Sequence, residues 1–332
     1  MRRAVLLLAM LAMTIVAPAR AQPPDKVAFG LNWVAEAEYG GFYQALATGI
    51  YAKHGLDVTI KQGGPQVNHM QLLLAGRLDF NLASNSFLAM NFAKENIPFR
   101  AVASTFQKSP AVLIAHAGQG NDDFPSLKGK PILIGSDTRV GWWNFMKAKF
   151  GYTDAQIRPY TFNLAPFLSD KAAIQQGLLG SEPFSIKEAT GEDPVVMLIA
   201  DAGFTGYALL ITTSDKNIQE RPDYVQRFID ASMEGWYTYL YGDATAGDAL
   251  ILKENPEMTQ KLIDYSRATI KQRGIMDSGD ASAGGIGAMS DERWKAFYAQ
   301  TQAEGIYQPG IDVSKAYTLQ FVNKGAGMSV RH

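Results

Sequence analysis

The fold is decided by residues 27–65, which read VAFGLNWVAEAEYGGFYQALATGIYAKHGLDVTIKQGGP. The stretch opens with a short apolar run that is typical of a buried strand. After a polar loop and two glycines, apolar residues recur at the spacing of one helix face. Gly55 stands where a helix C-terminal cap is expected, and residues 56–60 alternate as a second strand does. The stretch therefore predicts one strand–helix–strand unit of an α/β fold.

The polar loop of this unit is the first candidate for a binding site. It contains Asn32, Trp33, Glu36, Glu38 and Tyr39. The loop lies between the carboxyl end of a strand and the amino end of a helix, where open α/β sheets bind ligands. Aromatic rings offer flat faces to a ligand ring, whereas amides and carboxylates offer directed hydrogen-bond acceptors.

The start of the chain has the order of a secretory signal peptide. A basic start, Met1-Arg2-Arg3, precedes an apolar run over residues 4–17 and the small-residue cleavage site Ala19-Arg20-Ala21. The alternative is a membrane anchor, but the run is shorter than the ~20 apolar residues that a spanning helix needs. We expect cleavage before Gln22 and export to the periplasm.

Composition narrows the class of protein further. The 332 residues are enough for two domains, and the absence of cysteine excludes disulfides, thiolate metal sites and a lipid-bearing cysteine. Loss of the signal peptide leaves 28 basic residues against 32 acidic ones, a net charge of −4. A mildly acidic chain without basic runs gives no reason to expect a nucleic acid or an anionic membrane as partner.

The sequence carries no familiar catalytic or cofactor motif. HExxH, GxSxG, GxxxxGK[ST] and a GxGxxG after a strand are all absent. His54 and His69 have no histidine or carboxylate partner four residues further on. We therefore predict no catalytic residue, no metal site and no cofactor.

Two later loops repeat the arrangement of the first. Ser84 and Asn85 follow a short predicted strand, and Asp137 and Thr138 follow another, over residues 131–135. Each pair precedes a predicted helix, so each supplies a plain helix cap, groups for a ligand, or both. The loop with Asp137 and Thr138 repeats the strand–loop–helix order of the first unit, so we expect it to face that unit across a cleft.

The segment Ser181-Glu182-Pro183-Phe184 reads as a helix start. Proline is tolerated there, and an acid favours the positive end of the helix dipole. The functional alternative is that Glu182 accepts a hydrogen bond from a ligand. Elsewhere we predict helices over residues 167–179 and 291–303, a core helix from the apolar stripe of 224–240 and a glycine-rich surface loop over 277–287.

Seven short segments, in this order and spacing, resemble the NMT1/THI5-like group of ABC-transporter substrate-binding proteins, which includes carriers of thiamine pyrimidine precursors, sulfonates and nitrate. The resemblance covers roughly residues 25–245. The matching segments are Leu31-Asn32-Trp33, Gly41-Phe42-Tyr43, Gly49-Ile50-Tyr51, Gly55-Leu56-Asp57-Val58, Gly63-Gly64-Pro65, Gly76-Arg77-Leu78-Asp79-Phe80 and Leu127-Lys128-Gly129-Lys130.

The resemblance implies an α/β, two-lobed periplasmic-binding-protein fold of type II. Residues 22–109 and 207–332 would form one lobe and residues 110–206 the other, with two extended crossings as a hinge. The protein would be a monomer that captures a small solute and delivers it to an ABC permease in the inner membrane. Fungal pyrimidine synthases that resemble this fold carry a cysteine-rich motif, which is absent here.

In pyrimidine-carrying members, an acid in the matching Ser-Glu-Pro segment contacts the amino group of the ring, which favours a thiamine-precursor pyrimidine as ligand. One alternative is a sulfonate, nitrate or aromatic-acid carrier, in which Arg139 and the two facing helix termini would have to dominate over Glu182. The other is a secreted enzyme of pyrimidine metabolism. The predicted ligand-binding residues are Asn32, Trp33, Glu38, Tyr39, Ser84, Asn85, Asp137, Thr138, Trp142, Glu182 and Phe184.

Overall fold

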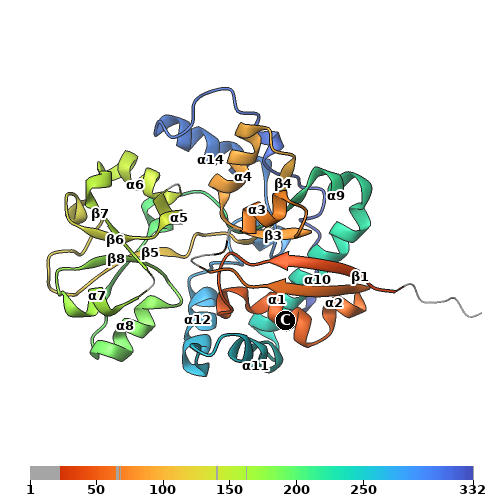
Figure 1. Cartoon of the computed structure of the whole chain (residues 1–332), viewed down its shortest axis with the longest axis horizontal. Coiled ribbons are helices and arrows are strands. Elements are labelled where there is room, and N and C mark those ends of the chain that lie inside the picture. The colour runs from red at the N-terminus through yellow and green to blue at the C-terminus, as the bar shows by residue number, and fades with distance from the viewer. Residues whose placement is uncertain (1–22, 65–66, 68, 140, 162, 332) are drawn as a thin grey trace, which may run out of the picture.

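The structure is a computed structural model that describes residues 23–331 apart from 65–66, 68, 140 and 162, with the backbone alone at 136 and 137. The predicted signal peptide and the cleavage site before Gln22 lie outside the described residues. Two five-stranded sheets, each the centre of one lobe, stand side by side (Figure 1). This is the expected α/β architecture.

The first sheet has the strand order β2-β1-β3-β10-β4, and the second has the order β7-β6-β8-β5-β9. The strands of the first sheet are β1 (Asp25–Gly30), β2 (Leu56–Lys61), β3 (Phe80–Asn85), β4 (Phe99–Phe106) and β10 (Ala208–Ser214). Those of the second are β5 (Ala111–Ala115), β6 (Ile132–Ile134), β7 (Ile157–Pro159), β8 (Ile174–Leu178) and β9 (Val195–Leu198).

Helices cover both sheets (Figure 1). The α-helices are α1 (Gly40–Ala47), α2 (Ile50–Lys53), α3 (His69–Leu74), α4 (Ser86–Glu95), α5 (Ser136–Arg139), α6 (Trp142–Phe150), α7 (Ala165–Ser169), α8 (Glu182–Thr190), α9 (Asp215–Glu220), α10 (Pro222–Tyr241), α11 (Thr245–Glu254), α12 (Gln260–Gln272), α13 (Ala281–Gly284) and α14 (Asp291–Ala303). The 3-10 helices are η1 (Ala37–Tyr39), η2 (Pro125–Leu127), η3 (Asp154–Gln156), η4 (Ile199–Ala202), η5 (Val313–Lys315) and η6 (Met328–Arg331).

The strand–helix–strand unit forms as its sequence predicts. β1 and β2 pair in parallel, from Asp25 opposite Leu56 to Gly30 opposite Lys61. Gly49, with φ 73°, separates α1 from α2, and Gly55, with φ 71°, turns the chain into β2. A left-handed backbone costs glycine little, so Gly49 can interrupt the helical run between α1 and α2, and Gly55 can end α2 where β2 must begin.

The apolar stripe of α10 packs on the first sheet, which confirms that it is core. The Phe228 ring lies 4.1 Å from the ring of Phe80 and 5.6 Å from that of Tyr51, measured between centroids. Trp236 on the same helix is fully buried. Gly41 of α1 lies so close to this tryptophan that a Cβ at Gly41 would stand 2.2 Å from its ring.

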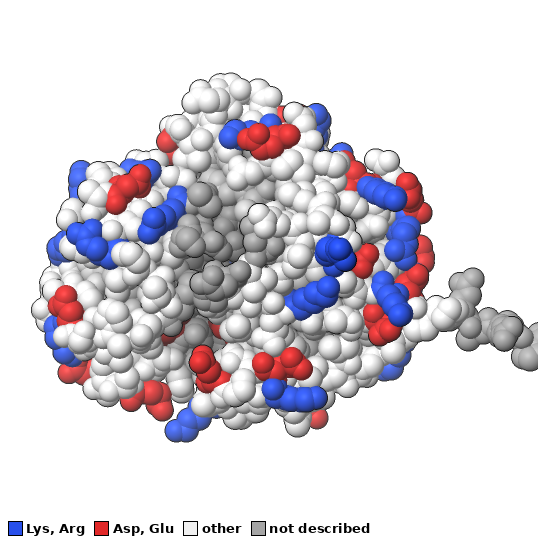
Figure 2. All heavy atoms as spheres, viewed as in Figure 1, with Lys and Arg blue, Asp and Glu red and all other residues white. Residues whose placement is uncertain are grey.

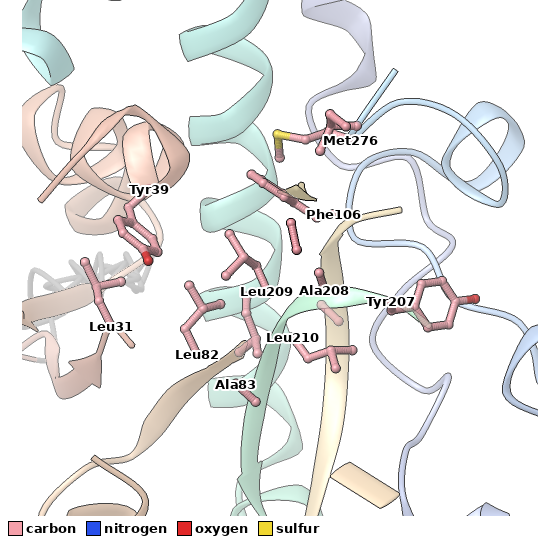
Figure 3. Packing of buried hydrophobic residues seen from close by; sticks show 14 of the residues in the cluster. Leu31, Tyr39, Leu82, Ala83, Phe106, Tyr207, Ala208, Leu209, Leu210 and Met276 are labelled. Atoms are coloured by element: carbon pink, nitrogen blue, oxygen red, sulfur yellow. The ribbon is translucent and has the colours of Figure 1, made fainter. Parts of the chain in front are cut away.

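The two crossings between the sheets run past the core of the first lobe. The chain leaves β4 at Phe106 for β5 and returns into β10, which lies antiparallel between β3 and β4. Figure 3 shows Leu82, Leu209 and Leu210 from these strands close together, with Phe106 and Met276 above them. The ends of β4 and β10 are therefore anchored in packed apolar side chains.

The predicted helix over residues 167–179 is wrong. A short helix, α7, ends at Ser169, and residues 174–178 form β8 in the middle of the second sheet. β8 pairs antiparallel with β5 over five residues and parallel with β6. Short apolar runs do not distinguish a helix from a buried strand, and here partners distant in the sequence made the choice.

The predicted surface loop over 277–287 is also wrong. Ala281 and Ile286 are buried, and the backbone N–H of Ile286 donates to the Tyr237 hydroxyl at 3.0 Å. A Cβ at Gly287 would come within 2.6 Å of the Met233 sulfur, so the glycine permits a close approach to α10. Small residues here serve tight packing as well as turning.

Figure 2 shows acidic and basic side chains interspersed over both lobes on the face in view. No single-signed stripe runs across this face, in keeping with the balanced composition. Within the part of the chain that the structure describes, no helix is both long enough and apolar enough to cross a membrane.

Candidate ligand-binding cleft

A cavity of about 180 Å³ lies where loops of the two lobes meet. A single buried water needs only ~10–15 Å³ of such space, so this cavity has room for a small organic solute. The residues that line it are Asn32, Trp33, Glu36, Glu38, Tyr39, Ser84, Asn85, Ser109, Pro110, Ala111, Thr138, Trp142, Gln176, Gly177, Leu178, Ser181, Glu182 and Leu209.

The first lobe contributes the loop after β1 and the end of β3. Asn85 is the N-cap of α4, and its Oδ1 accepts a hydrogen bond from the backbone N–H of Phe87 at 3.1 Å. The predicted capping role is therefore confirmed. The Asn85 amide also donates to the Ser84 hydroxyl at 3.3 Å, so both side chains are held at the cavity wall.

The second lobe contributes Glu182 as the first residue of α8, with Ser181 as its N-cap. Oε2 of Glu182 accepts the backbone N–H of Leu178 at 2.8 Å, and Oε1 accepts the Tyr160 hydroxyl at 3.1 Å. Glu182 is thus a helix start with its carboxyl held in place. Each of its oxygens has a second lone pair that can accept a bond from a ligand.

Nine of the eleven predicted site residues line the cavity. The side chain of Asp137 lies outside what the structure describes. Phe184 does not line the cavity, because the α8 helix turns its ring towards α12, 5.1 Å from the ring of Tyr265 between centroids. Phe184 instead packs at a contact between the lobes, together with the Lys261–Glu188 ion pair at 3.9 Å.

The prediction missed several lining residues for identifiable reasons. Gln176 and Gly177 were hidden by the incorrect helix over 167–179. Leu209, which has a φ of 46° just after the second crossing, carries no local signal. Glu36 stands two residues before Glu38 in the same polar loop, and this position could have identified it as a lining residue.

Three carboxyl groups dominate the electrostatics of the cavity. Burial, followed by the charges of Glu38 and Glu182, raises the pKa of Glu36 well above its ordinary value. Burial raises the pKa of Glu38 to about 7, although its own backbone N–H and the Ser266 hydroxyl oppose the rise. Burial also raises the pKa of Glu182, opposed first by the N–H of Leu178.

No lysine, arginine or histidine is among the described residues that line the cavity. Arg139 is exposed, and its charge helps to lower the pKa of Asp154, after stronger effects of Trp143 and Lys147. Nor do the carboxyls form a metal site, since no group of three or more metal-ligating side chains in the described part of the chain is placed to hold an ion. The cavity therefore favours ligands with hydrogen-bond donors or positive charge.

Comparison of the whole chain with known proteins identifies its fold and family. The chain is 23% identical over 319 residues to the riboflavin-binding protein RibY of Chloroflexus aurantiacus, covering 93% of this chain and 90% of RibY. The solved alkanesulfonate-binding protein SsuA of Xanthomonas axonopodis, bound to MOPS, has a TM-score of 0.64 at 13% identity, with 90% of this chain and 99% of SsuA covered.

The desulfurization enzyme DszB has a TM-score of 0.57 at 13% identity, covering 90% of this chain and 97% of DszB. At identities this low, the structural likeness establishes the fold alone, which is that of type II periplasmic binding proteins. The same fold is used by binding proteins and by an enzyme. A family model described as NMT1/THI5 like matches residues 36–244. The chain belongs to the NMT1/THI5-like family.

Proposed function

We propose that this protein is the solute-binding component of an ABC importer and captures a small nitrogen-containing heteroaromatic solute between its lobes. The observation that carries the proposal is the cavity lined by three carboxyls and by aromatic rings, with no basic side chain among its described lining residues. A carboxylate accepts charge-assisted hydrogen bonds from ring N–H or amino groups. Trp33 and Trp142 offer faces for the ring.

A thiamine-precursor pyrimidine is the first candidate ligand, because its amino group would match the carboxyl of Glu182. Riboflavin is a second candidate, and the likeness to RibY supports it. The likeness to SsuA would favour a sulfonate, but a sulfonate would have to enter a cavity bordered by Glu36, Glu38 and Glu182. Each of these carboxyls that is ionised repels such a ligand, and no basic side chain among the described lining residues attracts it, so the geometry disfavours the anion carriers.

Replacement of Glu182 by glutamine is expected to weaken binding of an amino-bearing ring. The change keeps the shape of the side chain but removes the charge and replaces one acceptor with a donor. Loss of one charge-assisted bond corresponds to a roughly 10- to 100-fold rise in Kd. Calorimetric titration of wild type and Glu182→Gln with 4-amino-2-methylpyrimidine, riboflavin and butanesulfonate measures this.

The sulfonate provides the internal control for that experiment, because its affinity should stay the same or increase when the carboxylate is removed. Tight binding of butanesulfonate by the wild type, and none of either ring, would overturn the proposal. Equal affinities of wild type and Glu182→Gln for every ring would mean that Glu182 only starts α8 and holds Leu178.

The enzyme alternative has one observation in its favour. Glu38 has a pKa of about 7, which suits a general base near neutral pH, and it lines the cavity. The cavity lining includes four serine or threonine hydroxyls, those of Ser84, Ser109, Thr138 and Ser181, but none of them is among the groups that shift the pKa of Glu38. Recovery of each probe unchanged after incubation supports a carrier, and conversion of the probe to a product would support the enzyme.

We further propose that the mature protein acts in the periplasm and delivers its solute to an inner-membrane permease. The basic, apolar and Ala-x-Ala order of residues 1–21 predicts cleavage before Gln22. N-terminal sequencing of the mature protein from its host should therefore read Gln-Pro-Pro-Asp. Recovery of a chain that still begins at Met1 in the membrane fraction would contradict export by this route.

A further inference from the structure

Glu36 is the least satisfied of the three carboxyls of the cavity. It is the N-cap residue of η1, only 7% of it is exposed, and it lines the cavity. Its Oε1 is buried and has no hydrogen-bond partner among the described residues. Oε1 of Glu38 is also buried with no partner in the described part of the chain, but the nearby Ser266 hydroxyl and the backbone N–H of Glu38 itself favour the charged form of this carboxyl. Both carboxyl oxygens of Glu182 accept hydrogen bonds from the protein.

No residue that the structure describes supplies Glu36 with a partner of opposite charge. The charged groups that face it are Glu38 on η1 and Glu182 on α8. Tyr39 and Tyr43 also lie within its electrostatic reach. The Tyr43 hydroxyl is likewise buried without a partner among the described residues, with Glu254 of α11 near it. Buried polar groups are nearly always hydrogen-bonded, so an unpartnered carboxyl at a cavity wall is a group that a ligand can complete.

We propose that Glu36 is a second ligand-binding carboxyl, which accepts an N–H or O–H donor of the solute on the side of the first lobe. This inference rests on the proposed function. With Glu182 on the second lobe, it defines the substrate class: a solute that presents hydrogen-bond donors to both lobes at once. Rings with two amino groups, or with an amino group and a hydroxyalkyl group, belong to this class, and rings with hydrogen-bond acceptors alone do not.

The experiment compares a probe with two donor groups with a probe that has one. The probes are 2,4-diaminopyrimidine and 4-aminopyrimidine, titrated calorimetrically against wild type, Glu36→Gln and Glu182→Gln at pH 8. Wild type should bind the diamino probe more tightly. Glu36→Gln should lose about 10- to 100-fold in affinity for the diamino probe, and less for the monoamino probe, because only the former reaches both carboxyls.

Glu304→Gln is the matched control. Glu304 also has a buried carboxyl oxygen without a partner among the described residues, and burial raises its pKa, but it lies at the end of α14 and does not line the cavity. Its replacement should leave both affinities unchanged. A thermal melt of each variant excludes misfolding as the cause of any loss.

The outcomes separate the two proposals. If the wild type binds neither aminopyrimidine, nor riboflavin, the proposed function fails. If it binds the probes but Glu36→Gln changes the affinity for the diamino probe no more than Glu304→Gln does, the function stands and the role of Glu36 is overturned. An equal loss for both probes would place Glu36 at the single donor that they share, which also contradicts recognition of two donors.

Discussion

Replacing Glu38 with glutamine is expected to stabilise the ligand-free protein at pH 8 by roughly 3 kcal/mol, since each tenfold change in an acid dissociation constant corresponds to about 1.36 kcal/mol. Glu38 is only 3% exposed, and burial raises its pKa from 4.5 to about 7. At pH 8 the native protein therefore holds an ionised carboxyl in a buried site, whereas the unfolded chain holds it in water. Glutamine keeps the shape without that charge.

The pH dependence of this effect has a defined sign. Between about pH 4.5 and 7 the native carboxyl keeps a proton that the unfolded chain has released, so this group lowers the free energy of unfolding as the pH rises. The difference between wild type and Glu38→Gln should be near zero at about pH 4 and reach its plateau above about pH 7. Urea unfolding of both proteins across this range measures it.

Glu257→Gln is the control for Glu38→Gln, because Glu257 is exposed at the surface. Its replacement should leave the free energy of unfolding within a few tenths of a kcal/mol at each pH, as most surface changes do. A constant difference between wild type and Glu38→Gln across the whole pH range would show that shape or hydrogen bonding, and not the charge, accounts for the change.

Replacing Arg293 with methionine is expected to be the most destabilising single change considered. Its guanidinium donates to the backbone carbonyl of Gln107 on the first crossing and, at 3.1 Å, to that of Thr205 just before the second. It also lies over the Tyr207 ring, 4.2 Å from the centroid. One side chain on α14 thus ties both crossings to the first lobe. Methionine would leave both carbonyls without this donor, at about 1–3 kcal/mol for each buried acceptor.

The loss should be visible as a lower urea midpoint and as faster hydrogen exchange at residues 107–109 and 205–208, where the crossings lose their anchor. Arg273→Met is the matched control. Arg273 also bridges the lobes, pairing with Asp201 at 2.9 Å, but both side chains are about half exposed. Exposed ion pairs contribute about 0–1 kcal/mol. Equal losses in the two variants would mean that the crossings do not depend on Arg293.

Local features of the sequence were enough to predict most single elements near the site. The Ser290 cap of α14 and the acidic residues Asp291 and Glu292 in its first turn act on neighbours a few residues away, and the predicted bounds 291–303 are those observed. The same holds for the Asn85 cap and for the turn at Gly55. Such features form from backbone geometry and short-range hydrogen bonds, which the order of residues specifies directly.

In the second sheet, local features of the sequence were not enough to predict the secondary structure. Residues 174–178 are compatible with a helix or a strand, and they became β8 because β5 and β6 offered hydrogen-bonding partners on both sides. The incorrect helix concealed Gln176 and Gly177 from the predicted site. Phe184 packs on Tyr265, whereas Glu182 lines the cavity, and no local feature of the sequence distinguishes these two positions.

The sequence by itself determined the α/β class and the strand-end loops that carry most of the cavity wall, and its resemblance to a known family implied the two lobes. Only the tertiary structure decided how their side chains interact. Glu36 and Glu38 stand two residues apart in one loop, yet the Ser266 hydroxyl of α12 favours the charged form of Glu38 alone, whereas Glu36 meets only burial and the charges of other carboxyls. Both also feel the charge of Glu182 from the other lobe. Burial and Coulomb interaction depend on distances through space between residues far apart in the chain, and folding alone sets those distances.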